Sequence, residues 1–166
     1  MSLPAYLFLY DENGRLLNGG SLASGREGAI EVMSSSYGVT QPVDPHTGRV
    51  NGCRKHEAFV IHKVVDKLSP LFAVCVCHAR RLQKAEVKYY EINHAGIEQE
   101  VYRITMEGVV IMSVNAAHTY IPGSKNHNMI ETVSLRFNRI EWHYLDGMIK
   151  YGDAWSTSDQ QPQDNE

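Results

Sequence analysis

Residues 58–82 read AFVIHKVVDKLSPLFAVCVCHARRL, a strand-like run followed by the clearest helix signal in the chain. Apolar side chains occupy both faces of an extended chain over 58–65, which predicts a strand covered on both sides. Ser69 suits a helix N-cap and Pro70 the first helical position, so the pattern predicts a helix that continues to Leu82. A single helix set among strands is the feature from which the fold class follows.

The surface of this predicted helix is more apolar than one sheet face can cover. Leu71 belongs to an apolar stripe, and Phe72 and Val76 extend the apolar surface around the side of the helix. We therefore expect Leu71, Phe72 and Val76 to meet another element or a neighbouring subunit.

Strand patterns fill most of the remaining sequence. The predicted strands cover residues 4–10, 30–39, 85–92, 98–112 and 133–144. Near Asn138 and Arg139 the apolar residues switch from odd to even positions, which predicts a bulge or a sharp bend. Because one helix interrupts these strands, the sequence predicts a mainly β fold: an antiparallel β-barrel of two sheets with one flanking α-helix.

Length and composition limit the classes of protein. The 166 residues suffice for one domain, which we expect over residues 1–152, followed by a polar, disordered tail over 153–166. The net charge of −3 removes the positive field that nucleic-acid binding needs. No basic segment followed by an apolar run opens the chain, and no apolar run approaches the ~20 residues that span a bilayer. We expect a protein without a cleaved signal peptide and without a membrane partner.

Catalytic and metal-binding patterns are weak throughout. Residues 20–27 have the glycine spacing of a phosphate loop, but Arg26 and Glu27 replace its lysine and its hydroxyl. The eight histidines form no metal-binding motif, and no nucleophile elbow is present. Cys75 and Cys77 point in different directions on the predicted helix and favour buried thiols in a reducing compartment. The sequence predicts no catalytic residue, no metal and no cofactor.

A long segment, residues 40–56, separates two of the predicted strands and is too long for an ordinary hairpin connection. Pro42, Pro45, Gly48 and Gly52 restrict or shape its backbone, which lowers the cost of ordering it in a contact. From the residues alone, a docking segment and a mobile surface loop are equally good interpretations.

Three stretches together resemble the haemolysin-coregulated protein (Hcp) family, the tail-tube proteins of bacterial type VI secretion systems. The first is GAIEVMSSSYGVTQP at 28–42, and the second runs from DPHTG at 44–48 to DKLSPL at 66–71. The third combines LQKAEVKYY at 82–90 with VSLRFNRIEW at 133–142. These stretches follow the family's order and span nearly the whole chain.

The resemblance implies a non-enzymatic tube subunit. Such a chain forms homohexameric rings that stack into a hollow tube, carries small effector proteins in the lumen, and is fired by a contractile sheath together with a trimeric spike protein. It implies a bacterial cytoplasmic protein that is later secreted. It also implies that the long segment stacks on the next ring, through Pro42, Asp44, Pro45, His46, Thr47, Gly48 and Arg49.

A lumen needs a small, polar face, and residues 30–39 offer one. In an unbroken strand, Val32, Ser34 and Ser36 share a face, and we expect these residues to line the channel. An ordinary exposed strand face is the simpler alternative for the serines.

Two other functions fit the same composition. One is a monomeric β-barrel that binds a small apolar ligand in its interior. The other is a hydrolase whose histidine and carboxylate groups meet only in the folded chain.

Overall fold

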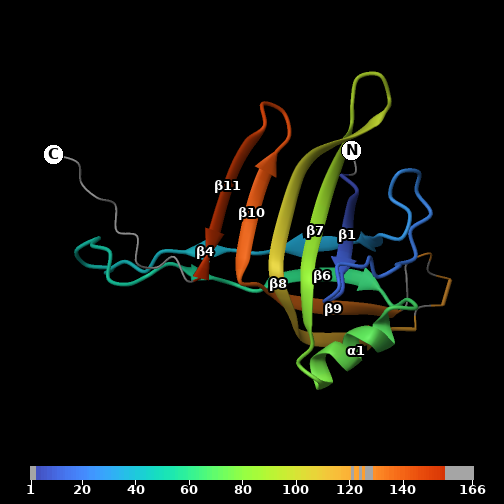
Figure 1. The fold of residues 1–166 in the computed structure, drawn as a ribbon, viewed down its shortest axis with the longest axis horizontal. Helices are drawn as coiled ribbons and strands as arrows, with labels where there is room; N and C mark the ends of the chain where they lie inside the picture. The colour runs from blue at the N-terminus through green and yellow to red at the C-terminus, as the bar shows by residue number, and fades with distance from the viewer. Residues whose placement is uncertain (1–2, 121, 124, 126–128, 156–166) are drawn as a thin grey trace.

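Most of the chain forms one antiparallel sheet of nine strands (Figure 1). The computed structural model describes residues 3–120, 122–123, 125 and 129–155. The elements are β1 (Ala5–Tyr10), β2 (Ile30–Val32), β3 (Ser34–Ser36), β4 (Val39–Thr40), β5 (Lys55–His56), β6 (Phe59–Val64), α1 (Ser69–Cys77), β7 (Arg81–Ile92), β8 (Glu98–His118), β9 (Met129–Arg136), β10 (Arg139–Tyr144) and β11 (Ile149–Ala154). The path through the sheet is β2-β1-β7-β8-β9-β6-β3, with β10 and β11 added beside β8. The mainly β class and the antiparallel pairing are confirmed.

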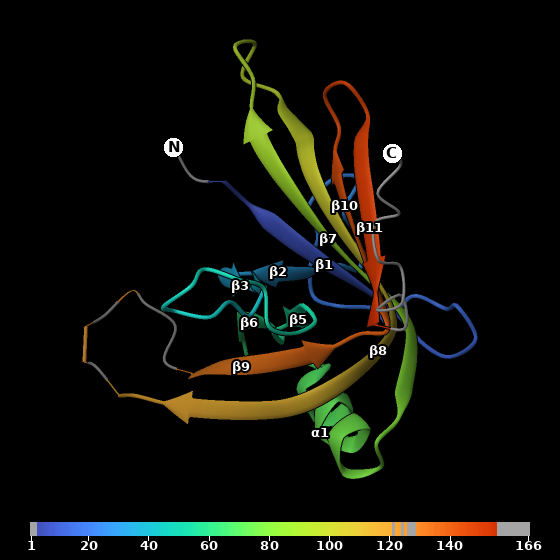
Figure 2. The same ribbon diagram turned by 90° about the vertical axis from the view of Figure 1, so that its left-hand side faces the viewer.

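Strand β8 connects the two layers of the fold. Its first half pairs with β7 and β10, and its second half bends away to pair with β9 (Figure 2). At the bend Gly108 has φ +62°, and Asn138 approaches so closely that a Cβ at Gly108 would collide with it. The Asn138 N–H donates to the Glu107 carbonyl between the ends of β9 and β10, which confirms the predicted bend near Asn138 and Arg139.

Residues 30–36 bring the two ends of the sheet together. β2 pairs with β1 and β3 pairs with β6, while the Met33 N–H between them donates to the His62 carbonyl at 2.8 Å. Among the described residues neither short strand is paired on both sides, so the barrel is not closed, and β4 and β5 form a second, two-stranded sheet. The prediction of one strand over 30–39 is wrong, because the chain divides here into β2, β3 and β4.

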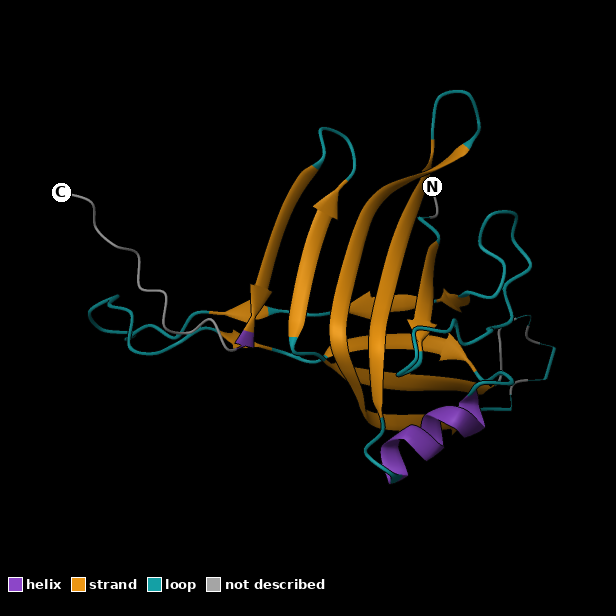
Figure 3. Cartoon of the chain, in the orientation of Figure 1, coloured by secondary structure: helices purple, strands orange, loops and turns teal. Residues whose placement is uncertain are grey.

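The interior is filled by side chains from every part of the sheet. The largest fully buried apolar side chains are Leu7, Leu9, Ile30, Phe59, Ile61, Phe72, Leu82, Ile104, Met106, Ile111 and Leu135. Helix α1 packs against β8 below the sheet (Figure 3). Phe72 and Cys75 are its fully buried residues.

The helix is shorter than predicted. It ends at Cys77, because Ala79 takes a left-handed φ of +47° and reverses the chain. Leu82 already belongs to β7, where it is buried opposite Val109 of β8. Ser69 is not the N-cap. Leu68 holds that position, and no side chain caps the helix.

The end of the described chain also differs from the prediction. Asp153 and Ala154 belong to β11 and pair with β10, so the predicted tail over 153–166 begins too early. Residues 156–166 of that tail lie outside the described residues. Within the described part, no helix has the length and apolar character needed to cross a membrane.

Candidate functional site

The outer face of four neighbouring strands is small and polar. Across β3, β6, β9 and β8, the register aligns Ser34, His62, Thr132 and Asn115 in one row, and Ser36, Val60, Ser134 and Ser113 in the next. We call these eight residues the polar face. His62 Nδ1 and Thr132 Oγ1 lie 3.0 Å apart across β6 and β9. The polar face contains no aspartate, glutamate, lysine or arginine, so only His62 can carry a charge.

The structure separates Val32 from the two serines. Ser34 and Ser36 are exposed on the polar face, whereas Val32 is 7% exposed and belongs to the core. The assignment of Val32 to a channel lining is wrong. Its physical reason is the break at Met33, which leaves Met33 and Ser34 both exposed and shifts the alternation by one residue.

Behind the polar face, Ser35 points into the fold and meets a group of tyrosines. Ser35 Oγ and the Tyr89 hydroxyl lie 2.8 Å apart, and the Tyr89 and Tyr102 rings lie 5.9 Å apart. Burial, followed by the nearby Tyr37 and Tyr89, raises the pKa of Tyr102 to about 12 from its ordinary 10.0. Ionisation of Tyr102 in the folded chain therefore opposes folding.

We expect the free energy of unfolding to fall as pH rises from about 10 to about 12, because the unfolded chain releases the Tyr102 proton first. The contribution of Tyr102 is fully present below pH 10. Tyr102→Phe should remove part of this pH dependence in urea titrations at a series of pH values. Tyr120→Phe is the matched control, because Tyr120 is 74% exposed. Equal slopes for both variants would contradict the assignment.

Residues 39–56 form a hairpin that leaves the body of the fold, and we call it the arm (Figure 1). β4 pairs with β5 at its base, and Val43 bridges to Val50 nearer the tip. At the tip, Asp44 Oδ1 accepts the N–H groups of His46 and Thr47 at 2.7 and 2.9 Å. The predicted stacking residues all lie in the arm: Pro42, Asp44, Pro45, His46, Thr47, Gly48 and Arg49.

The base of the arm is fixed to the last strand, β11. The Asp153 carboxylate pairs with both Arg54 and His56, with His56 Nε2 at 2.7 Å from Oδ2. Arg54 also donates to the Ala154 carbonyl at 2.6 Å. Trp155 and Phe137 pack against the buried His56 ring. This linkage, which the sequence analysis missed, sets the direction in which the arm leaves the sheet.

A buried ionic network holds the start of α1 against the sheet. Lys63, near the end of β6, is fully buried and pairs with Glu131 of β9, which is 2% exposed. Lys63 Nζ also lies 3.1 Å from Asp66 Oδ1, and Ser69 donates to Glu131 at 2.7 Å. Ser69 therefore acts as a bridge within the network. The sequence pattern indicated apolar cover on both sides of this strand and did not indicate the network.

The three helix residues expected at an interface have different surroundings. Phe72 is fully buried in this chain's own core, so its assignment to a subunit interface is wrong. Leu71 and Val76 are partly buried and pack against the core. Cys75 is buried, and its burial raises the pKa of the thiol, whereas Cys77 is exposed. The expectation of a buried Cys77 is therefore also wrong.

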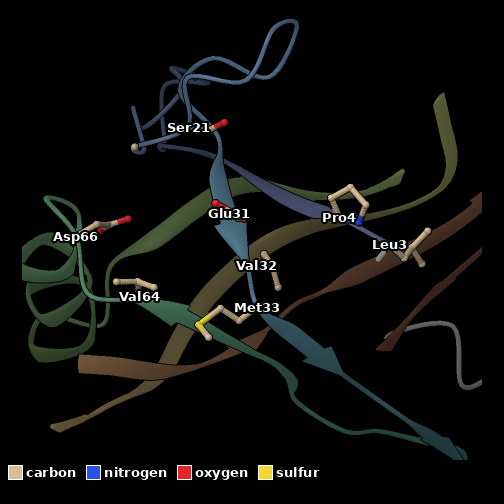
Figure 4. A pocket seen from close by; sticks show the side chains of 9 residues that line it. Leu3, Pro4, Ser21, Glu31, Val32, Met33, Val64 and Asp66 are labelled. Atoms are coloured by element: carbon tan, nitrogen blue, oxygen red, sulfur yellow. The ribbon is translucent and has the colours of Figure 1, made fainter. Parts of the chain in front are cut away.

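Among the surface grooves are two that we call the β2 pocket and the helix groove. The β2 pocket has a volume of about 590 Å³ and is lined by Leu3, Pro4, Gly20, Ser21, Glu31, Val32, Met33, Val64 and Asp66 (Figure 4). The helix groove, of about 430 Å³, is lined by Val65, Ser69, Ala73, Val76, Cys77, Val114, Ala116, Met129 and Glu131. Among the described residues, no three His, Cys, Asp or Glu side chains are placed to hold a metal ion.

Together these features define a class of fold: an incomplete antiparallel barrel with one flanking helix and a projecting hairpin arm. The chain belongs to the Hcp family of type VI secretion system effectors, which matches residues 6–144. This match confirms the resemblance found in the sequence. The chain is thus a secreted tube protein of type VI secretion.

Similar proteins agree over nearly the whole length. The "Major exported protein" of Pseudomonas aeruginosa is 26% identical over 93% of this chain and 96% of its own. A variant of Hcp1 from E. coli EAEC 042 superposes with a TM-score of 0.84 at 36% identity, covering 93% of this chain and 99% of its own. The secreted protein Hcp3 of Pseudomonas aeruginosa shares the fold, with a TM-score of 0.74 at 22% identity, over 93% and 99% of the two chains.

Proposed function

We propose that this chain is the non-enzymatic subunit of a type VI tube built from stacked homohexameric rings. Small effector proteins travel in the lumen, and contraction of the sheath drives the tube and its trimeric spike protein out of the bacterial cytoplasm. The observation that carries this proposal is the polar face together with the two unpaired strand edges that bound it.

One of these edges belongs to β8. Its pairing with β7 ends at Val110, opposite Arg81, whereas its pairing with β9 continues to His118. From Met112 to His118, the side of β8 that faces away from β9 has no strand partner within the described residues. Strand β3, at the other boundary, pairs with β6 and with no other strand of the described chain.

Unpaired strand edges attract further strands, because their N–H and C=O groups lack partners. When β3 of one copy pairs with the β8 edge of the next, the contact is head-to-tail, and repetition of such a contact closes into a ring where the rotation divides the circle. The polar face lies between the two edges, so the ring places it around the central hole. The eight positions of the polar face carry no aspartate, glutamate, lysine or arginine, so this part of the proposed lumen accommodates water and proteins of either net charge.

The interior of the barrel gives less support to the small-ligand alternative. Large apolar side chains such as Phe59, Ile61 and Met106 fill it and are at most 2% exposed. The two grooves described above open on the surface.

Native mass measurement tests the ring directly. We expect particles of six times the 18.7 kDa subunit mass, and electron micrographs that show annuli with a central hole. Material that stays at the mass of one subunit across the micromolar range would contradict the ring and favour the monomeric ligand-binding alternative.

A further inference from the structure

The arm and the β2 pocket lie at opposite ends of the same pair of strands. Strand β6 begins at Phe59, near the arm, and ends at Val64, which lines the pocket. The neighbouring segment 32–36 runs the opposite way: Val32 lines the pocket, and Ser36, opposite Val60, lies near the arm. Figure 1 shows the arm leaving on one side and β6 ending on the other. Copies that repeat by translation along these strands therefore bring the arm of one to the pocket of the next.

The tip of the arm presents two apolar side chains and a cation. Val43 is 51% exposed and Val50 is 66% exposed, which leaves an apolar pair uncovered on a projecting hairpin. Arg49 is exposed and has no ion-pair partner in the described part of the chain. The Asp44 carboxylate is held within the tip by backbone N–H groups, which also lower its pKa. The tip is thus a shaped, apolar and cationic element.

The β2 pocket has the complementary chemistry. Its floor is apolar, with Val32, Met33 and Val64, and its volume of about 590 Å³ falls within the roughly 300–1,000 Å³ of specific ligand pockets. Of its two carboxylates, Asp66 lies 3.1 Å from the Lys63 ammonium, which it shares with Glu131. Glu31 is exposed and has no cationic partner among the described residues.

The helix groove matches the arm less well. Its lining is apolar, and its one carboxylate, Glu131, is 2% exposed and already paired with Lys63. An arm bound there would leave Arg49 without a partner. Charge therefore favours the β2 pocket of the two.

We propose that residues 43–50 of one copy insert into the β2 pocket of a second copy in the adjacent ring, with Val43 and Val50 on the apolar floor and Arg49 paired with Glu31. This inference rests on the proposed stacking of rings and adds the site that receives the arm. Within one ring all arms leave the same face, since rotation relates the copies, so the contact forms only between rings.

Charge reversal tests the pair in the full chain. Arg49→Glu and Glu31→Arg should each lower the fraction of stacked rings about tenfold or more, since like charges then meet at the contact. The double variant should recover most of the stacking. Asp146→Arg, on the β10–β11 turn, is the matched control and should stack as the unaltered chain does. Sedimentation and electron microscopy give the readout, at a concentration where unaltered rings stack.

Disulfide capture tests the same contact where stacking is weak. With the exposed thiols removed by Cys53→Ser and Cys77→Ser, a chain carrying Val50→Cys and Met33→Cys is treated with copper-phenanthroline in air. The copper complex catalyses the oxidation, and dioxygen takes up the two electrons and two protons that each thiol pair loses. We expect a ladder of linked chains on a non-reducing denaturing gel. Val50→Cys paired with Asp146→Cys is the control and should give no ladder.

The outcomes separate this inference from the proposed function. Intact rings that stack despite Glu31→Arg, or that give no ladder in the chain carrying Val50→Cys and Met33→Cys, overturn the pocket assignment alone. Cross-linking of Val50→Cys to a retained Cys77 would place the arm in the helix groove and also overturn it. Absence of rings by native mass refutes the proposed function instead.

Discussion

Lys63→Met should lower the free energy of unfolding by roughly 3–5 kcal/mol, the range for breaking a buried ion pair by removal of one partner. Lys63 is the one cationic partner of Glu131 among the described residues, and the Glu131 side chain is 2% exposed. Without Lys63 the carboxylate keeps, in that part of the chain, the Ser69 hydroxyl alone. Urea titration at a fixed protomer concentration measures the change, because assembly couples stability to concentration.

Three companion variants identify the cause. Glu131→Gln should cost less than Lys63→Met, because Lys63 keeps Asp66 as a partner at 3.1 Å. The double variant Lys63→Met with Glu131→Leu should recover most of the loss, since it leaves no unpaired buried charge. Arg80→Met is the surface control. It breaks the exposed Arg80–Glu12 pair and should change stability little. A double variant as unstable as Lys63→Met would show that the ammonium is needed for packing and not for charge balance.

The strand order of this fold could be predicted only in part, because the sequence carries local periodicity but not pairing. The short aromatic run of β1, the alternation in β7 and β8 and the phase switch near Asn138 were sufficient to place these strands and the bend. The register that joins β3 to β6 across the sequence depends on contacts between distant residues. Only those contacts show that the segment 30–36 belongs to both ends of the sheet.

The errors come from places where tertiary structure overrides a local signal. Helix propensity carried the predicted helix to Leu82, but burial of Leu82 against β8 and the left-handed Ala79 end it at Cys77. Strict alternation put Val32 with Ser34 and Ser36, and the break at Met33 separates them.

The buried network was visible in the sequence in one respect. Phe59, Ile61 and Lys63 share the phase that faces the core, so a lysine in that phase indicates a buried partner. The partner, Glu131, lies 68 positions further along the chain, and it can be identified only from the β6–β9 register. For the candidate site, the sequence indicated that Ser34, Ser36 and the arm lie on the surface, as they do. The register added the other six residues of the polar face: Val60, His62, Ser113, Asn115, Thr132 and Ser134.

Ser34→Arg combined with Ser36→Arg should leave the rings intact and abolish the protection of small proteins in the lumen. Both serines are exposed on the polar face, and their backbone pairing with β6 does not depend on the hydroxyl groups. Each copy adds two guanidinium groups to a face that otherwise carries at most the charge of His62. Long cationic side chains then fill and charge the hole of the ring. Native mass spectrometry measures ring integrity, and mass spectrometry of the proteins that co-purify measures cargo.

The matched control places two arginines elsewhere on the surface. Ser24→Arg with Ala95→Arg adds the same charge at exposed loop positions and should leave both rings and cargo unchanged. Loss of rings in the Ser34 and Ser36 variant alone would make the polar face a subunit contact and not a lumen. Retention of cargo by intact rings would show that the serines face away from the channel. Because the β3 edge lies beside these serines, the two readouts together distinguish the edge that joins the copies from the face that they enclose.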